Sequence, residues 1–519
     1  MKKISNLGVV LLSIGLFALS CGKDDGPDTP GQQNTVEIDE VDPLSGPVGT
    51  LVTLDGKNFG DTMADNTVKF NGVAAIIKTA STTRLTVEVP DGATDGPITV
   101  KVGDDMATSS SDFTVTADNG TDVIELNFTE LELHTLDTQQ LEVTNLAKFE
   151  GNPTVEWKVN DDNLLEIDEE GNVTALNSGQ ASVKATIGQL TQVCSINISP
   201  SVFVVGEEYN GDNDIATLWK NGEGTILETA GFGSYANDVF VHRKDVYAAG
   251  HETHTENIPE YIGKVWKNGS VLYTLKTDTE DDFRITSIYV TESGDVYNSG
   301  FGFQDNFVAI AQVWRNGQVE YVLNDADGYD TTIVSIFVTD QGVFTVGTQI
   351  IDDQRVATVW KNDQVLYILN ENENDVYANS IFVDENGNVY VAGSEAGQND
   401  QIAKIWKNGS VFYEAPESSS GSYYSAFAID NNVYACGHEL NGATYEAQIY
   451  ENGTVSNFTD GITSALTYSI FVHDGSSYIS GYQNNDEMNK VATVWKDKKQ
   501  LYALGDGKTH SEASSIFVK

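Results

Sequence analysis

The feature that most constrains this chain is a phrase that recurs through its C-terminal part. The stretch "IAKIWKNGSVFYEAP" begins at Ile402, and close copies begin at Tyr261, Ala309 and Val356. The aromatic residue of the phrase returns at intervals of 44 to 48 residues, at Trp219, Trp266, Trp314, Trp360, Trp406, Tyr450 and Trp495. A fixed period of this length is the signature of a repeat architecture, in which each copy is one supersecondary unit.

Each copy contains four short strand patterns, illustrated by residues 380–384, 388–393, 403–409 and 410–415. Four strands per period predict one blade of a β-propeller. The Asn-Gly pair of "KNGS" suits a two-residue hairpin, because both central residues need a positive φ. The repeat begins at a second strand (202–206) and ends with a first strand (514–519), so the last strand should complete the first blade. We therefore expect a seven-bladed propeller over residues 201–519.

Two smaller β-rich segments precede the repeat. The stretch "VDPLSGPVGTLVTLDGKNFGD" and the strands after it resemble the IPT/TIG family over residues 36–117. Glycines, aromatics and other residues fall where that family has its turn and core positions: Gly46, Gly49, Thr50, Gly56, Phe59, Gly60, Phe70, Gly72, Pro90 and Gly96. The resemblance implies an immunoglobulin-like sandwich used as a spacer or as a partner-contact module.

The segment 122–200 resembles the bacterial Ig-like group 2 family through "VEWKVNDDNLLEIDEEGNVTALNSGQASVKATIG", with Trp157 expected in its core. That resemblance carries a hint of adhesion, although a fold alone does not carry a function. The repeats resemble those of bacterial lipoprotein propellers with the phrase "VYVAG … WKNG". The expected fold class is all-β, with two Ig-like β-sandwiches followed by a seven-bladed β-propeller.

The N-terminal residues have the order of an export signal. A basic "MKK" start is followed by an apolar run from Leu7 to Leu19, which is too short to span a bilayer. The string "FALSC" resembles a bacterial lipobox, which implies a signal peptide at 1–20, lipidation of Cys21 and a flexible tether at 21–35. The next residues, "GKDDG", resemble the acidic signal that sends Bacteroidetes lipoproteins to the exterior of the outer membrane. Ordinary secretory cleavage nearby is the alternative.

Charge and cysteine content narrow the function further. The chain has 77 Asp and Glu against 29 Lys and Arg, a formal charge of −48, which repels nucleic acid. The acidic surplus would suit divalent cations, but no calcium motif supports such a site, so we expect no cofactor. The mature cysteines, Cys194 and Cys436, fall in different modules, which excludes a disulfide framework and favours buried core positions.

Binding residues are expected where the repeats disagree. The tryptophans recur in every blade and are therefore assigned to packing, whereas the long loops of one propeller face vary from blade to blade. Two columns of side chains border these loops and would suit stacking and directed hydrogen bonds. Their candidate ligand-binding members are Tyr235, Arg284, Tyr377, Tyr423, His251, Glu252, His438 and Glu439. The alternative is that each of them only anchors a loop.

No catalytic motif accompanies these residues. His251, Glu252 and His254 spell "HETH", which lacks the spacing and the helix of a zinc-protease motif, so no metal site is expected. The sequence has no G-x-S-x-G elbow and no phosphate loop. We expect a non-enzymatic cell-surface lipoprotein whose propeller binds a glycan, or a surface or host protein. The alternatives are a polysaccharide-active enzyme, either lyase or hydrolase, on the same face, and a protein-binding adhesin or scaffold.

Overall fold

The structure is a computed structural model that describes residues 35–116, 123–149, 153–253, 261–275, 282–303, 309–323, 330–370, 372–397 and 400–519. The predicted signal peptide, Cys21 and nearly all of the predicted tether lie outside the described residues. The predicted all-β class is confirmed, since the described elements are strands apart from two single-turn 3-10 helices, η1 (Met63–Asp65) and η2 (Leu146–Lys148). No described helix has the length and apolar character that crossing a membrane would need.

The first Ig-like domain contains two sheets, with strand orders β1-β3-β7-β6 and β2-β9-β8-β4-β5. Phe70 and Phe113 meet edge to face in its core, with ring centroids 5.0 Å apart. Gly56 is needed where two strands approach closely, because a Cβ there would lie 2.0 Å from the carbonyl oxygen of Glu37. The strands are β1 (Glu37–Asp42), β2 (Ser45–Gly46), β3 (Leu51–Lys57), β4 (Asn66–Phe70), β5 (Val73–Ala74), β6 (Ile76–Ala80), β7 (Arg84–Glu88), β8 (Gly96–Val102) and β9 (Asp105–Val115).

The second Ig-like domain also contains two sheets, β10-β16-β15-β12 and β11-β14-β13. Its core includes Leu141, Val183 and the free thiol of Cys194, all fully buried. Trp157 is only half-buried: it packs against this core and also borders a groove, so its expected core position is met in part. The strands are β10 (Glu130–His134), β11 (Thr138–Gln140), β12 (Glu156–Val159), β13 (Leu165–Ile167), β14 (Asn172–Ala175), β15 (Gly179–Ile187) and β16 (Leu190–Ser199).

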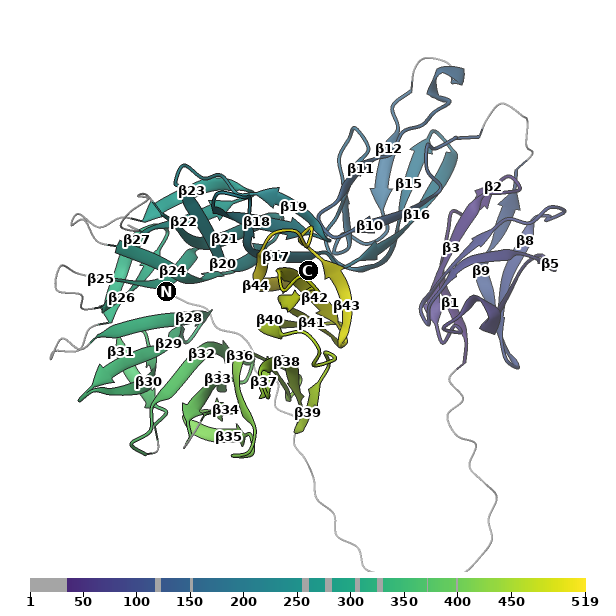
Figure 1. Ribbon diagram of the computed structural model, residues 1–519. Helices are drawn as coiled ribbons and strands as arrows, with labels where there is room; N and C mark the ends of the chain where they lie inside the picture. The colour runs from purple at the N-terminus through teal and green to yellow at the C-terminus, as the bar shows by residue number, and fades with distance from the viewer. Residues whose placement is uncertain are drawn as a thin grey trace, which may run out of the picture. The chain divides into compact units, whose positions relative to one another are not determined.

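Beyond Ser201, the described chain forms seven consecutive four-stranded antiparallel sheets, the blades of a propeller (Figure 1). Blade 1 is β17 (Val202–Tyr209), β18 (Asp214–Lys220) and β19 (Glu223–Ile226), with β44 (Ser511–Val518). Blade 2 is β20 (Gly233–His242), β21 (Asp245–Thr253), β22 (Tyr261–Lys267) and β23 (Ser270–Leu275). Blade 3 is β24 (Asp282–Val290), β25 (Val296–Phe303), β26 (Ala309–Arg315) and β27 (Gln318–Leu323).

Blades 4 to 7 repeat the same order of strands along the chain. Blade 4 is β28 (Thr331–Thr339), β29 (Gly342–Ile351), β30 (Gln354–Lys361) and β31 (Gln364–Ile368). Blade 5 is β32 (Val376–Val383), β33 (Val389–Ala396), β34 (Gln401–Lys407) and β35 (Ser410–Glu414). Blade 6 is β36 (Ser420–Ile429), β37 (Asn432–Asn441), β38 (Thr444–Glu451) and β39 (Thr454–Asn457). Blade 7 is β40 (Ala465–His473), β41 (Ser476–Asn484), β42 (Lys490–Lys496) and β43 (Lys499–Ala503).

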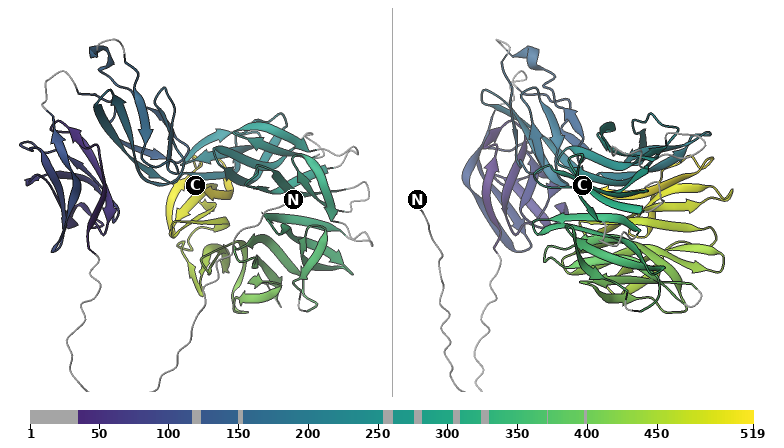
Figure 2. Two further views of the ribbon diagram at one scale, coloured as in Figure 1. Left: turned by 180° about the vertical axis from the view of Figure 1, so that it is seen from behind. Right: turned by 90° about the vertical axis from the view of Figure 1, so that its left-hand side faces the viewer.

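The ring closes between its first and last strands. Strand β44 pairs antiparallel with β17, from Val202 opposite Val518 to Glu208 opposite Ser511. Figure 1 labels β44 beside β17, and Figure 2 shows the yellow C-terminal end of the chain next to the blue-green start of the propeller. The inner strands also carry a closed circle of seven aromatic rings, each 4.7 to 5.1 Å from the next: Phe240, Tyr289, Phe337, Phe382, Phe427, Phe471 and Phe517. Both contacts hold the chain terminus within the ring.

The repeated residues serve packing and turns, as predicted. All six propeller tryptophans and Tyr450 are buried, with at most 4% of the side chain exposed. Asn268 and Gly269 have φ values of 51° and 86°, and Asn408 and Gly409 have values of 51° and 81°, so both central residues of these hairpins adopt the left-handed region. The Asn268 side chain also accepts the N–H of Val246, which ties the hairpin to the neighbouring strand.

Each inner strand has a β-bulge, and in blades 1 to 5 and in blade 7 the residue after the bulge bonds to the next blade. In six blades this residue is a serine, whereas blade 2 has Asp238. The Asp238 carboxylate accepts the hydroxyl groups of Ser287 and Ser515, each at 2.7 Å, together with the Ile288 N–H at 2.9 Å. Because Ser515 lies on β44, this carboxylate links the closing strand to blades 2 and 3.

The second Ig-like domain contacts the propeller on the face that carries the short hairpins. Asp137 accepts the Lys220 ammonium at 2.6 Å, and Lys244 forms an ion pair with Glu166. The backbone of Lys519 pairs with that of Ser201, where the domain meets the propeller. These contacts leave the opposite face of the propeller, where the variable loops lie, uncovered by this domain.

Candidate functional site

The candidate site lies at the loop end of the inner strands, away from the circle of aromatic rings. Tyr235 stands near the start of β20 and Phe240 near its end, so the two rings mark opposite ends of one inner strand. The third strand of each blade has a small residue beside this column, such as Gly263 or Ala447, which leaves room for large side chains on the first two strands. The repeat therefore leaves a similar space at this place in each blade, and the side chains that fill the space differ between blades.

In blade 2, aromatic rings fill this space. Tyr235 and His251 are cross-strand partners and stack with ring centroids 5.0 Å apart, and Tyr261 meets the imidazole edge-on at 5.1 Å. The Tyr235 hydroxyl donates to Asp214 at 2.9 Å. The Asn237 amide bonds to the carbonyl of Ile285 at 2.6 Å, which fixes blade 2 against blade 3. The structure thus brings together two of the predicted ligand-binding residues, Tyr235 and His251.

Arg284, a third predicted residue, reaches the same cluster from blade 3. Its guanidinium carbon lies 3.8 Å from the centroid of the Tyr261 ring and 5.9 Å from that of Phe303. Its charge adds to burial in lowering the pKa of His251 to about 4. The imidazole is therefore neutral at physiological pH and can both donate and accept a hydrogen bond.

A second group of aromatic side chains spans blades 6 and 7. Tyr424 stacks on His438 at 5.6 Å, and Tyr445 meets the same imidazole edge-on at 4.9 Å. Tyr424 also contacts Tyr468 at 5.6 Å, which in turn lies 6.0 Å from Tyr482. Burial lowers the pKa of His438 to about 4, so this imidazole is neutral as well.

Acidic residues of blade 1 join the two groups. Tyr468 donates to Glu512 at 2.7 Å, and Lys490 forms an ion pair with the same carboxylate. Glu512 is the cross-strand partner of Glu207, whose pKa is raised to about 8 by burial and by the charge of Glu512. Glu207 is therefore largely protonated at neutral pH. We call the aromatic set that these residues connect the aromatic arc: Tyr424, His438, Tyr445, Tyr468, Tyr482, Tyr235, His251 and Tyr261.

For two of the residues predicted from the sequence to bind a ligand, burial shows that the prediction is wrong. Tyr423 is fully buried in the core between blades 5 and 6, and the residue equivalent to Tyr235 is its neighbour Ser422, which pairs with His438. Glu252 is also fully buried, and it accepts the backbone N–H of Ala230 and pairs with Lys264 at 3.1 Å. Neither side chain is available to a ligand, so Glu252 anchors a loop.

Of the three remaining predicted residues, Glu439 and Tyr377 lie outside the arc. Glu439 accepts hydrogen bonds from Ser419 and from the Asn457 amide, a loop-anchoring arrangement like that of Glu252. Tyr377 lies under the exposed guanidinium of Arg355, at 5.7 Å, in blade 5. His438 belongs to the arc. The arc members that sequence reasoning missed are Tyr261, Tyr424, Tyr445 and Tyr468; Tyr482 stood in an aligned column but was not chosen.

Among the described residues, no group of three or more His, Cys, Asp or Glu side chains is placed to hold a metal ion. The "HETH" stretch is described only as far as Thr253, and His254 lies outside the described residues. Within the described part, His251 contacts aromatic rings and Glu252 pairs with a lysine. The arrangement therefore suits hydrogen bonding and stacking.

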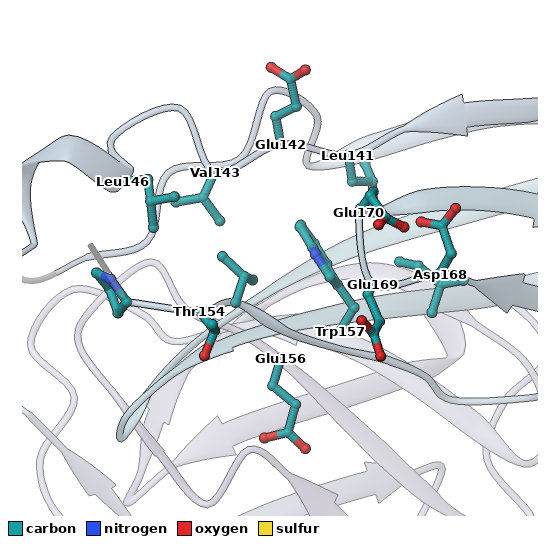
Figure 3. A pocket seen from close by; sticks show the side chains of 13 residues that line it. Leu141, Glu142, Val143, Leu146, Thr154, Glu156, Trp157, Asp168, Glu169 and Glu170 are labelled. Atoms are coloured by element: carbon teal, nitrogen blue, oxygen red, sulfur yellow. The ribbon is translucent and has the colours of Figure 1, made fainter. Parts of the chain in front are cut away.

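A separate groove of about 1040 Å³ lies on the second Ig-like domain. The half-buried Trp157 supplies its aromatic surface, between Val143 and Leu146 on one strand connection and Asp168 on another (Figure 3). The side chains of Glu142 and Glu156 point away from the Trp157 ring in this view. The groove is a surface on which an extended segment could lie, distinct from the arc.

Comparison with known protein families agrees with this architecture. The IPT/TIG domain family matches residues 37–116, the bacterial Ig-like domain (group 2) family matches residues 121–196, and a β-propeller repeat family matches residues 366–394. The chain carries an IPT/TIG domain, a group 2 Ig-like domain and propeller repeats. No curated protein matches it.

Solved structures that match this chain at low identity include proteins of different described roles. An auxiliary nutrient binding protein from Bacteroides thetaiotaomicron is 13% identical, covers 72% of this chain and 98% of its own, and has a TM-score of 0.19. One with the same description from Bacteroides ovatus is 12% identical, covers 91% and 100%, and has a TM-score of 0.24. A polysaccharide lyase, an ulvan lyase bound to a saccharide, is 8% identical, covers 63% and 91%, and has a TM-score of 0.38. Similarity at this level assigns neither ligand nor activity.

Proposed function

We propose that this chain is a non-enzymatic cell-surface lipoprotein whose propeller captures a glycan at the aromatic arc. The supporting observation is that six tyrosines and two neutral histidines form two contact groups at the loop end of the propeller, one on blade 2 and one on blades 6 and 7, with acidic residues of blade 1 between them. Aromatic rings pack against the apolar faces of pyranose rings, while phenol and imidazole groups supply directed hydrogen bonds. Such a row would take several sugar units in succession.

The order of the modules supports presentation at the cell surface. The proposed anchor at Cys21 comes first, the two Ig-like domains follow and the propeller comes last. The contacts of the second Ig-like domain fall on the hairpin face, as in the pair of Lys220 with Asp137. The anchor itself is tested by metabolic labelling of the expressed full chain with a palmitate analogue, since Cys21→Ala should abolish the label.

Capture and catalysis are separated by one experiment. The purified protein is run in native gels containing a panel of polysaccharides, and the same mixtures are assayed for reducing ends and for unsaturated products. Retardation without product is the expected result. Product formation would favour a lyase or hydrolase instead, and retardation by no polysaccharide would overturn the glycan proposal.

Variants in the arc locate the site. Tyr261→Ala and Tyr445→Ala should each weaken retardation, since loss of one stacked aromatic costs about 1 kcal/mol or more. Phe412→Ala is the matched control, because this ring is 44% exposed on the outer strand β35, outside the arc. Equal retardation of the arc variants and the unmodified protein would remove the binding site from the arc.

The groove beside Trp157 favours a second candidate function, contact with a protein partner. Thr154 is exposed at this groove, so Thr154→Lys would obstruct it without entering the core. If protein contact is the main role, this variant loses adhesion to a cell or protein surface while its retardation by polysaccharides is unchanged.

A further inference from the structure

We infer that the ligand of the aromatic arc is an acidic saccharide, and that Arg284 anchors its carboxylate or sulfate group. This inference rests on the proposed glycan-binding function and adds the chemical class of the ligand. It begins from the surroundings of one guanidinium group. Blade 3 places Arg284 at the margin of the arc, beside Tyr261 and Phe303.

Among the described residues, Arg284 lacks the acidic partner that Arg84 and Arg315 have. Arg84 pairs with Asp55 at 2.6 Å and Arg315 with Asp295 at 2.8 Å, whereas Arg284 forms no ion pair with any carboxylate of the described residues. Its Nε is buried and has no hydrogen-bond partner in the described structure. The chain has 77 acidic residues, but none of those that the structure describes is paired with this half-buried cation.

The aromatic neighbours of Arg284 orient its guanidinium group but accept no hydrogen bond from it. The guanidinium carbon lies 3.8 Å from the Tyr261 ring centroid, so one planar face is covered by an aromatic ring. Stacking of this kind orients the plane but leaves the N–H groups along its edge to find acceptors elsewhere. A buried donor without an acceptor is costly, and a ligand oxygen placed there would relieve that cost.

Carboxylate and sulfate groups fit such an edge. The guanidinium presents paired N–H donors in a planar fork that matches two oxygens of one anion. The adjacent aromatic rings of Tyr261 and Tyr235 would take the apolar faces of the sugar that carries the anion. The combination of one fixed cation with a row of rings distinguishes an acidic saccharide from a neutral one.

Three described acidic residues beside the arc, Glu512, Asp214 and Glu207, do not oppose this assignment strongly, because each is either paired or protonated. Glu512 is held by Lys490 and by the hydroxyl of Tyr468, and Asp214 accepts the hydroxyl of Tyr235. Burial and the charge of Glu512 raise the pKa of Glu207 to about 8, so this carboxyl is largely protonated at neutral pH. These carboxyl groups therefore contribute less negative charge near Arg284 than their number would suggest.

The test compares chemically matched saccharide pairs by affinity electrophoresis and calorimetry on the full chain. Polygalacturonate is paired with its fully methyl-esterified form, and dextran sulfate with dextran. The expected result is tighter binding of one acidic member than of its neutral counterpart. The polygalacturonate arm identifies a uronate ligand and the dextran sulfate arm identifies a sulfate ester.

Variants assign the preference to Arg284. Arg284→Gln should weaken binding of the acidic saccharide by roughly 10- to 100-fold, as expected for a lost hydrogen bond to a charged group. Arg284→Lys keeps the charge but loses the planar fork and should recover only part of the affinity. Arg355→Gln is the control, because this exposed arginine also lies over a tyrosine, Tyr377, but belongs to blade 4, outside the arc.

The outcomes separate this inference from the proposed function. Equal affinity for acidic and neutral members, or an unchanged affinity in Arg284→Gln, overturns the anion anchor while glycan binding stands. Binding of no saccharide by the unmodified protein overturns the proposed function, and the anchor with it. Melting curves of Arg284→Gln and Arg284→Lys show whether a loss of affinity comes from unfolding, and the comparison is then made at a temperature where both are folded.

Discussion

The phenol ring of Tyr235 stacks on the imidazole of His251, with ring centroids 5.0 Å apart and planes 23° from parallel. The two residues are directly opposite each other on β20 and β21, so the stack is a cross-strand pair at the loop end of blade 2. Its position on paired strands means that the site is held by sheet hydrogen bonds as well as by loops. The arc can therefore be altered by single substitutions while the blade remains intact.

The neighbouring tyrosines Tyr423 and Tyr424 should respond to mutation in opposite ways. Tyr423 is fully buried, and Tyr423→Ala should lower the free energy of unfolding by about 3 to 5 kcal/mol. Tyr424 lies half-buried in the arc, so Tyr424→Ala should weaken glycan retardation and cost less stability. Urea unfolding and native-gel retardation of the two variants check this. Similar unfolding midpoints for both would contradict the assignment of Tyr423 to the core.

The half-buried imidazole of His251 should make the fold less stable in mild acid. Its folded-state pKa is about 4 against an ordinary 6.5, so below pH 6.5 the unfolded chain binds a proton that the folded chain does not. Stability should fall as pH drops from 6.5 to 4, by on the order of 1 to 3 kcal/mol for this group. Melting temperatures measured across this window should fall less steeply in His251→Gln. Parallel profiles for the two proteins would show that the imidazole is not desolvated.

Glu207 should give the opposite pH dependence. Its folded-state pKa is raised to about 8 from an ordinary 4.5, so between these values the folded chain retains a proton that the unfolded chain releases. Its contribution to stability is complete below pH 4.5 and is lost as the pH rises through 8. Glu207→Gln removes this titration. The melting temperature of the variant should therefore fall less between pH 5 and pH 8 than that of the unmodified protein. A Glu207→Gln variant that is destabilised equally at both values would exclude a protonated Glu207.

The propeller could be predicted from the sequence because its evidence repeats. The recurring Trp and the Asn-Gly hairpins meet the same packing and turn requirements in each blade. The incomplete set of strands at each end of the repeat predicts the pairing of β17 with β44. The site was harder, because it depends on residues that do not repeat. The string "SYYSAF" offers two adjacent tyrosines, and a shift of one residue moves a side chain to the opposite face of a strand. The β-bulge between Tyr423 and Ser425 adds a further change of register that no pattern in the sequence marked.

Contacts between blades could not be predicted at all from single repeats. Tyr261 lies on β22 and Arg284 on β24, so their approach to 3.8 Å depends on how blade 2 packs against blade 3. The burial of Glu252 depends similarly on the loop that its carboxylate holds through Ala230. A polar residue beside a variable loop can face the ligand or anchor the loop, and only the fold distinguishes these cases.

Asp238 should be a point at which closure of the ring can be weakened. Asp238→Ala removes the acceptor for Ser287 and Ser515, each now bonded at 2.7 Å, and leaves the Ile288 N–H without its side-chain partner. We expect a loss of about 1 to 3 kcal/mol in the free energy of unfolding, together with faster proteolysis of β44. Asp238→Ser inserts the residue found at this position in the other blades and should lose less.

The matched control is Ser335→Ala, which removes a single bond to the Ile381 N–H at 3.2 Å, away from the closing strand. It should cost less than Asp238→Ala and leave the protease resistance of β44 unchanged. Urea unfolding and limited proteolysis followed by mass spectrometry measure the two effects separately. If Asp238→Ala and Ser335→Ala unfold at the same urea concentration and release the C-terminal strand equally, then the Asp238 carboxylate does not hold the ring closed, and closure depends on β17 pairing and on the aromatic circle through Phe517.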